Sequence, residues 1–197
     1  MEFEEGIFDF FDDEKSEVKR AGSISAASIV TKNRQKFLRT KRQAEVEKFI
    51  YDLDEEDALH LVSNGEFGSI EILFDINKKF KILKAYLMSW SLSNEFFDLY
   101  QTLGIKSADF FIDKSIISRH PQYYARLLAL KNFGVATNLV YGLHAKTSIF
   151  LTEKGFFTLE SSANYARNVR IEQYCLTKSK SLYLFHKNWM DQIKCKS

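Results

Sequence analysis

The chain carries two pairs of polar residues toward its C-terminal end, each with one residue between its members. The first pair is His144 and Lys146, and the second is Ser162 and Asn164. Alternate side chains of a β-strand point to the same face, so each pair would act together if it lay in a strand. The sequence Glu153-Lys154-Gly155 predicts a tight turn between them, which would bring cross-strand neighbours to about 5 Å. We therefore expect one patch with an imidazole, an ammonium, a hydroxyl and an amide.

These four groups suit phosphoryl transfer, which needs a nucleophile, stabilisation of charge on the phosphate oxygens and a proton for the leaving group. The imidazole of His144 can attack phosphorus and form a phosphohistidine. The ammonium of Lys146 neutralises charge, and Ser162 and Asn164 donate charge-assisted hydrogen bonds of about 1.5–3 kcal/mol each. Glu172 would accept the proton of the second ring nitrogen and fix the histidine tautomer. These side chains would suffice for the reaction without a metal or a cofactor.

The pattern resembles that of the phospholipase D superfamily, which has H-x-K, a strand and a turn, G/S-S-x-N, and a downstream N-x-x-x-E-like step. Here the three parts read His144-Ala145-Lys146, Ser161-Ser162-Ala163-Asn164 and Asn168-Val169-Arg170-Ile171-Glu172. The resemblance is close in the motif and looser over residues 58–195. It implies that His144 is the nucleophile or general acid and that Glu172 orients it. It also implies phosphate ligands, which are Lys146, Asn164 and, as an accessory donor, Ser162.

Two positions depart from the family pattern. Leu151 stands where the family often has an Asp, and Ser161 stands where Gly is usual. These departures leave open a catalytically inactive protein of the same fold that binds nucleic acid or serves in assembly. A phospholipid-directed phosphodiesterase is a further alternative, for which Phe156, Phe157 and Tyr165 beside the motif could form an apolar surface.

The chain has one H-x-K motif, whereas the family's catalytic centre uses two such histidines. The other histidines, His60, His120 and His186, have no Lys two residues later, and we expect them to be ordinary surface or partly buried side chains. The resemblance thus points to the single-motif, nuclease-like branch, whose members pair two protomers about an axis through the active site. An isologous dimer is also the commonest symmetric assembly. We expect a homodimer in which the two His144 side chains meet.

Composition indicates an intracellular protein. With 45% apolar and 15% aromatic residues the chain can build a core. Cys175 and Cys195 form no C-x-x-C pair, which predicts free thiols in a reducing compartment. The start of the chain is acidic, unlike a signal peptide, and no apolar run approaches the roughly 18 residues of a membrane span. We expect a cytoplasmic protein without membrane association or a metal site.

Charge is distributed unevenly, although the net charge is only +2. Residues 1–14 carry seven acids and no base, and residues 15–48 carry ten Lys or Arg against three Glu. The basic residues 15–48 would attract a phosphate backbone. The same charge pattern is also expected of a solvated helix face, or of a segment masked by the acidic residues 1–14. The candidate nucleic-acid-binding residues are Lys32, Arg34, Lys36, Arg39, Lys41 and Arg42.

Strands and helices alternate from Asp57 onward, which predicts an α/β fold with a mixed β-sheet sandwiched between helices, as in the phospholipase D superfamily. Residues 1–50 would form a charged N-terminal extension, helical over about Lys32–Tyr51, and residues 51–197 the phospholipase D-like domain. The expected strands are Ala58–Ser63, Phe80–Ser89, Ala108–Asp113, Thr137–Tyr141, His144–Leu151, Phe156–Glu160 and Arg170–Thr177. The expected helices are Phe67–Ile76, Asn94–Leu103, Pro121–Phe133 and Lys180–Ile193, the last with an apolar stripe of Leu182, Phe185, Trp189 and Ile193.

The interpretation favoured by the sequence is a metal-independent phosphodiesterase, and specifically a nuclease that cuts DNA or RNA through a phosphohistidine. The site would lie at strand ends and in the loop after Ser162, where open α/β sheets bind ligands. Two further segments, Ser89-Trp90-Ser91 and Arg119-His120, carry suitable side chains, but the sequence does not fix their position.

Overall fold

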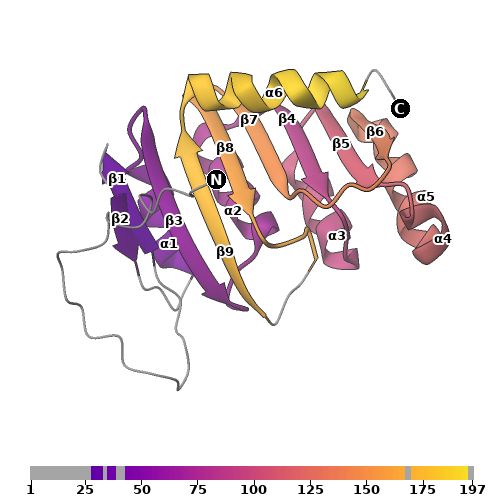
Figure 1. The fold of residues 1–197 in the computed structure, drawn as a ribbon, viewed down its shortest axis with the longest axis horizontal. Coiled ribbons are helices and arrows are strands. Elements are labelled where there is room, and N and C mark those ends of the chain that lie inside the picture. Colours follow the sequence, from indigo (N-terminus) through magenta and orange to yellow (C-terminus); the bar gives the residue numbers. More distant parts are fainter. Residues whose placement is uncertain (1–27, 33–34, 39–42, 167–169, 195–197) are drawn as a thin grey trace, which may run out of the picture.

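The computed structural model describes residues 28–32, 35–38, 43–166 and 170–194. Nine strands form one sheet in the order β1-β2-β3-β9-β8-β7-β4-β5-β6 (Figure 1). The strands are β1 (Ser28–Lys32), β2 (Gln35–Leu38), β3 (Asp57–Asn64), β4 (Ile82–Ser89), β5 (Ala108–Asp113), β6 (Val135–Val140), β7 (Thr147–Thr152), β8 (Gly155–Ser161) and β9 (Ile171–Lys178). The helices are α1 (Gln43–Tyr51), α2 (Ser69–Phe80), α3 (Asn94–Leu103), α4 (Ile116–Arg119), α5 (Pro121–Ala129), the 3₁₀ helix η1 (Leu130–Phe133) and α6 (Lys180–Lys194).

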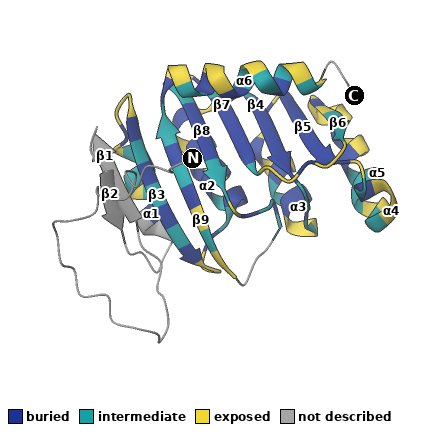
Figure 2. Cartoon of the chain, viewed as in Figure 1, coloured by how far each residue is buried: buried dark blue, intermediate teal, exposed yellow. Residues whose placement is uncertain are grey.

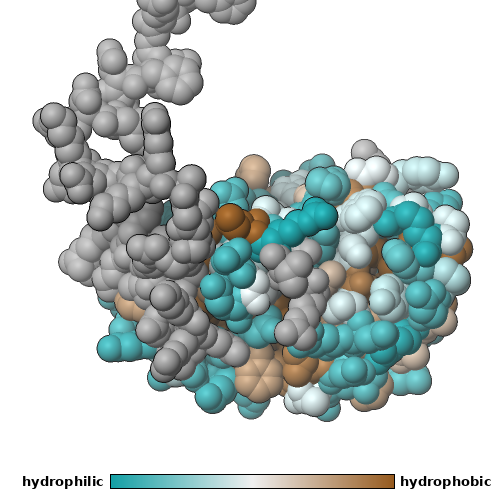
Figure 3. All heavy atoms as spheres, turned by 90° about the horizontal axis from the view of Figure 1, so that it is seen from below, coloured by the Kyte–Doolittle hydropathy of each residue, from teal (hydrophilic) through white to brown (hydrophobic). Residues whose placement is uncertain are grey.

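The sheet is mixed, and its connectivity brings distant segments to one edge. Strands β4, β5 and β6 are parallel, while β7 is antiparallel to β4, β8 to β7, β9 to β8 and β3 to β9. The carboxyl ends of β3, β4, β5, β6 and β8 therefore lie at the same edge as the amino ends of β7 and β9. We call this the site edge. It lies at the bottom of Figure 1 and faces the viewer in Figure 3, where hydrophilic side chains cover much of it.

Helices cover both faces of the sheet, which confirms the expected α/β sandwich. Helices α1, α2, α3 and α5 contact one another in sequence on one face, and α6 packs against β7 and β8 on the other (Figure 1). Successive residues of a strand face opposite sides. Phe110 accordingly lies in the larger apolar core, and Phe111 in the smaller one beneath α6. Strands β4, β5 and β7 are buried along most of their length (Figure 2).

Several element bounds match those expected from the sequence. Helix α3 and strand β5 have the predicted limits, and Gly104 ends α3 in the left-handed conformation, with a φ of 65°. The helix that begins at Pro121 continues through η1 to Gly134, which has a φ of 79°. A Cβ at Gly134 would lie 2.1 Å from the carbonyl oxygen of Lys106, so the turn into β6 requires glycine.

The N-terminal part of the domain corrects one prediction. The helix expected over about Lys32–Tyr51 begins only at Gln43, and strands β1 and β2 precede it. The β-branched run Ile29-Val30-Thr31 favours a strand, and β1 pairs antiparallel with β3. The proposed boundary after residue 50, between a charged extension and the main domain, stays a prediction.

Helix α6 corrects a second prediction. Its buried residues are Tyr183, His186 and Met190, whereas Phe185, expected in the apolar stripe, is 65% exposed. An imidazole does not count as apolar, but His186 is 6% exposed here, with a Glu160 carboxylate oxygen 3.3 Å from its Nε2. Its Nδ1 accepts a hydrogen bond from Trp189. The fully buried residues thus lie one position, about 100° around the helix axis, from the predicted stripe, although Trp189 and Ile193 of that stripe still pack against the smaller core.

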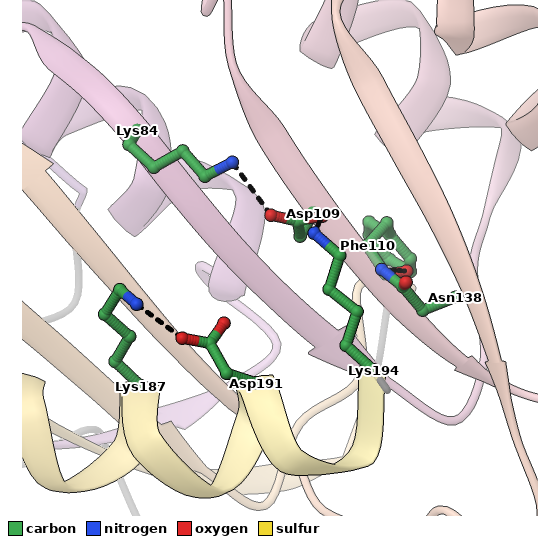
Figure 4. A network of polar contacts seen from close by, with 7 residues as sticks. All are labelled: Lys84, Asp109, Phe110, Asn138, Lys187, Asp191 and Lys194. Atoms are coloured by element: carbon green, nitrogen blue, oxygen red, sulfur yellow. Dashed lines mark hydrogen bonds and ion pairs between the residues drawn. The ribbon is translucent and has the colours of Figure 1, made fainter. Parts of the chain in front are cut away.

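A buried carboxylate ties the end of α6 to the sheet (Figure 4). Asp109 is 1% exposed, and its two oxygens lie 2.8 Å from Lys84 Nζ and 2.5 Å from Lys194 Nζ. Burial alone would raise the pKa of Asp109, but the hydrogen bonds and charges of the two lysines outweigh it and lower the pKa. Asp109 is therefore ionised in the folded protein at neutral pH.

Replacement of this carboxylate should destabilise the fold. Because both lysines stay partly exposed, we expect Asp109→Asn to lower the free energy of unfolding by about 1–3 kcal/mol at neutral pH, less than for a fully buried ion pair. Because the pKa of Asp109 is lower in the folded than in the unfolded protein, its ionised form stabilises the fold at pH values above the unfolded-state pKa. This stabilisation is lost as the pH falls through the folded-state pKa. Urea denaturation should thus show a smaller difference between wild type and variant at strongly acidic pH.

The matched control is Asp191→Asn, because Asp191 also pairs with a lysine of α6, Lys187, but its side chain is 40% exposed. We expect a change below about 0.5 kcal/mol for this surface pair. Equal stability of the two variants would contradict the anchoring role of Asp109.

Candidate functional site

His144 and Lys146 lie at the site edge, in the segment that enters β7. The expected strand over His144–Leu151 is wrong at its start, because β7 begins at Thr147. The physical reason is a tertiary contact: the backbone N–H of Leu143 donates to Asp113 Oδ2 of β5 at 3.0 Å, outside the strand ladder. Gly142 forms the preceding turn with a φ of 67°.

The two side chains meet although neither is in a strand. Lys146 Nζ lies 3.2 Å from both ring nitrogens of His144 and donates to the His144 carbonyl oxygen at 2.6 Å. His144 is exposed and Lys146 is half-buried. Partial burial lowers the pKa of Lys146, and the negative charge of Glu172 opposes this effect. An ammonium and an imidazole thus stand together at the surface.

Strand β8 places the second pair beside the first. Strands β7 and β8 pair antiparallel, with Thr147 opposite Glu160. Just beyond this register, the N–H of Ser161 donates to the carbonyl oxygen of Lys146 at 3.0 Å. The hydroxyl of Ser161 donates to the carbonyl oxygen of Ala163, which tightens the chain before Asn164. The predicted neighbouring strands are therefore present.

Asn164 is held by the carboxyl end of β4. Its Oδ1 accepts the backbone N–H of Trp90 at 3.1 Å. The next residue, Tyr165, donates its N–H to Ser89 Oγ at 3.0 Å and accepts from the N–H of Ser93. Within the described residues, no hydrogen bond involves the amide nitrogen of Asn164, so this donor is available to a ligand.

Ser162 and Glu172 form a unit of their own across β8 and β9. The Ser162 hydroxyl donates to the carboxylate of Glu172 and accepts the N–H of Gln173 at 3.0 Å. The backbone N–H of Ser162 donates to the carbonyl oxygen of Gln173. Orientation of His144 by Glu172, and a phosphate contact from Ser162, stay predictions.

The two departures from the family pattern have local structural explanations. Leu151 lies opposite Phe156 in the β7–β8 pair and packs against the apolar core beneath α6. A carboxylate there would face apolar side chains. Ser161, in place of Gly, uses its hydroxyl within the turn that leads to Asn164.

Sequence reasoning missed Asp113, which is only 7% exposed and ends β5 at the site edge. Besides the N–H of Leu143, its carboxylate accepts the N–H and the hydroxyl of Ser115. Burial alone would raise the pKa of Asp113, but these hydrogen bonds and the charge of Arg119 outweigh it and lower the pKa. The available signal was a carboxylate at the end of the apolar strand ADFFID.

Trp90 and Arg119, whose position the sequence left open, both lie at the site. The ring centroids of Trp90 and His144 are 6.1 Å apart. The guanidinium carbon of Arg119 lies 3.9 Å from the centroid of the Trp90 ring. Trp90 therefore links the two halves of the site, since its N–H holds Asn164 and its ring neighbours His144.

A cavity of about 130 Å³ borders Asn164 on the side of α2. Its lining includes the carboxylates of Glu66, Glu71 and Glu95. Glu66 and Glu71 accept the backbone N–H groups of Asn64 and Gly68, respectively. Acidic walls repel phosphate, so this cavity does not suit an anion.

Two predicted nucleic-acid-binding residues lie in strands apart from this cluster. Lys32 ends β1 and Lys36 lies in β2, at the opposite side of the sheet from β5 and β6. Arg34, Arg39, Lys41 and Arg42 lie outside the described residues, as does Cys195. Cys175 is a free thiol. In the described ranges, no three His, Cys, Asp or Glu side chains gather as a metal site, and no helix is long and apolar enough to cross a membrane.

The chain matches no protein-family model, and no curated protein matches it significantly in sequence. The solved structures that are similar include the following three. Polyphosphate kinase from Porphyromonas gingivalis aligns with a TM-score of 0.47 and 11% identity, covering 61% of this chain and 23% of the kinase. Yeast tyrosyl-DNA phosphodiesterase aligns with a TM-score of 0.36 and 15% identity, covering 49% of this chain and 26% of that protein. TrmBL2, an archaeal chromatin protein that binds DNA, aligns with a TM-score of 0.48 and 12% identity, covering 76% and 57%.

The chain thus spans about a quarter of the length of the kinase and of the phosphodiesterase. With TM-scores below 0.5, these similarities assign neither a family nor an activity, and the function is argued from the site itself.

The carboxylate of Asp113 should control the order of the segment that carries His144. Asp113→Asn removes the charge and one acceptor oxygen, and hydrogen bonds to charged groups contribute about 1.5–3 kcal/mol. We expect amide hydrogen exchange at Leu143 to accelerate by roughly tenfold or more. Asp98→Asn, which removes a surface partner of Arg126, should leave that amide unchanged. Unchanged protection in Asp113→Asn would contradict this role.

Proposed function

We propose that this chain is a metal-independent phosphodiesterase, and specifically a nuclease that cuts DNA or RNA through a phosphohistidine at His144. The observation that carries the proposal is the position of Trp90, whose backbone holds Asn164 while its ring neighbours His144. In this proposal, the imidazole of His144, the ammonium of Lys146 and the amide nitrogen of Asn164 act on the same phosphate at the site edge. The motif resemblance stated above supports the same assignment.

In the first step, a ring nitrogen of His144 attacks phosphorus and forms a P–N bond as the P–O bond to the leaving group breaks. Lys146 moves from the His144 carbonyl oxygen to the phosphate oxygens, and Asn164 Nδ2 donates to the same oxygens. Both contacts strengthen as charge develops there. The hydrogen bond between Ser162 and Glu172 stabilises the loop around Asn164 in this proposal. The carboxylate of Glu172 also supplies a negative charge near Lys146.

The leaving oxygen needs a proton, and a second histidine supplies it. In this proposal it is His144 of the partner subunit, brought in by a two-fold axis through the site. The same histidine then takes a proton from water, which attacks phosphorus and breaks the P–N bond. The net reaction is a phosphodiester plus water giving a phosphomonoester and an alcohol. Exposure of His144 at the site edge is compatible with such an approach.

We favour nucleic acid as the substrate because the site combines cationic and aromatic side chains. The basic segment Lys32–Arg42 would add affinity for the phosphate backbone. The phospholipid alternative depended on exposed aromatic residues near the motif. Phe157 and Tyr165 are instead buried, and Phe156 packs against Tyr183 at 5.0 Å. A cytoplasmic location remains part of this proposal.

A nuclease assay in excess EDTA tests the activity directly, with single- and double-stranded DNA and RNA as substrates. We expect cutting by wild type and its near-complete loss in His144→Ala. The control is His120→Ala, because His120 stacks on Tyr123 and takes no part in the proposed chemistry. Activity that survives in His144→Ala would reject the assignment. Salt-dependent binding without cutting would favour the inactive nucleic-acid-binding alternative.

The homodimer makes a separate prediction. Because each half-site lacks one histidine, specific activity per chain should fall on dilution in parallel with the dimer fraction, as measured by sedimentation velocity. A strictly monomeric protein with full activity would contradict the shared site.

A further inference from the structure

Trp90 and Arg119 form a stacked pair beside His144. The Arg119 guanidinium carbon lies 3.9 Å from the centre of the indole, a cation–π geometry. The guanidinium is fixed in place, since Arg119 Nε donates to Ser115 Oγ at 2.9 Å and Nη2 contacts the Trp90 carbonyl oxygen at 3.5 Å. The pair is therefore an ordered feature of the site edge.

Core packing does not account for Trp90. Its neighbours Ser89 and Leu92 are buried, whereas Trp90 keeps part of its surface exposed and belongs to neither apolar core. Its backbone N–H already serves Asn164. The indole ring lies next to the His144 ring and can contact a ligand that binds at the site.

A second pair of the same kind lies in the adjoining segments. Lys114 Nζ is 5.0 Å from the centre of the Tyr141 ring, and Tyr141 is 84% exposed. Lys114 follows Asp113 directly, and Tyr141 precedes Leu143 by two residues. The hydrogen bond between Asp113 and Leu143 thus brings this pair to the edge that carries His144.

We propose that Trp90 and Arg119 form a stacking platform for an unpaired base next to the scissile phosphate, so that the substrate is single-stranded nucleic acid. The inference rests on the proposed function and narrows its substrate. Aromatic rings and guanidinium planes bind the exposed faces of unstacked bases, and alternating aromatic and cationic groups are typical of single-strand sites. Bases in a duplex are stacked on both faces and offer no such surface. Tyr141 and Lys114 would receive a further nucleotide.

The chain allows a direct optical test, because it has two tryptophans, Trp90 and Trp189. In a Trp189→Phe, His144→Ala background, Trp90 is the sole tryptophan and the probe strand is not cut. We expect a single-stranded oligothymidylate to quench Trp90 fluorescence. The same strand annealed to its complement, or one of equal length with abasic sites, should bind roughly 5- to 100-fold more weakly without comparable quenching.

Affinity measurements with the full chain complete the test. Trp90→Ala should weaken single-strand binding by a similar factor, Trp90→Phe should retain most of it, and Arg119→Gln should be intermediate. Phe185→Ala is the matched control, because Phe185 is an exposed aromatic residue on α6 away from the site edge. If Trp90→Ala does not fold, Trp90→Phe, Arg119→Gln and the quenching measurement still test whether a base stacks on Trp90 and Arg119.

The outcomes separate the platform from the proposed activity. Quenching by single strands in a protein that cuts nothing would keep the platform and reject the nuclease. Equal cutting of single-stranded, duplex and abasic substrates, with no effect of Trp90→Ala, would keep the nuclease and overturn the platform.

Discussion

A buried, ionised carboxylate at the end of β5 holds two segments of the site edge at once. Asp113 accepts the N–H of Leu143, which fixes the residue directly before His144. It also accepts two hydrogen bonds from Ser115, whose hydroxyl in turn receives Arg119 Nε. The position of the proposed nucleophile and that of the guanidinium on Trp90 therefore depend on the same side chain. Local conformational preferences of the sequence do not by themselves determine the position of His144 or of the Arg119 guanidinium.

The mixed sheet makes this convergence possible. Parallel strands β4, β5 and β6 end at one edge, where β7 begins, and β8 returns the chain to that edge before β9 begins there. Segments far apart in the sequence thus meet without a long loop. The isolated bridge between Leu92 and Tyr165 joins the segment after β4 to the segment after β8.

Much of the fold could be predicted from the sequence, because it follows from local signals. The apolar run at β5, the Gly104 cap of α3 and the proline at the start of α5 each act within a few residues. Features set by distant contacts were not predictable. Examples are the late start of β7, fixed by Asp113, and the buried face of α6, fixed by His186 and Glu160. The proposed site divides in the same way: spacing identified His144, Lys146 and Asn164, whereas stacking of Arg119 on Trp90 becomes visible only once β4 and α4 are placed.

The central claim is that His144 forms a covalent bond to phosphorus. The most direct test is a single-turnover reaction with a single-stranded oligonucleotide, quenched in alkaline denaturant and followed by proteolysis and mass spectrometry. A phosphohistidine mechanism predicts a nucleotide adduct on the peptide that contains His144, appearing and decaying at rates consistent with turnover. Product release without any modified peptide, or an adduct on another residue, would contradict it.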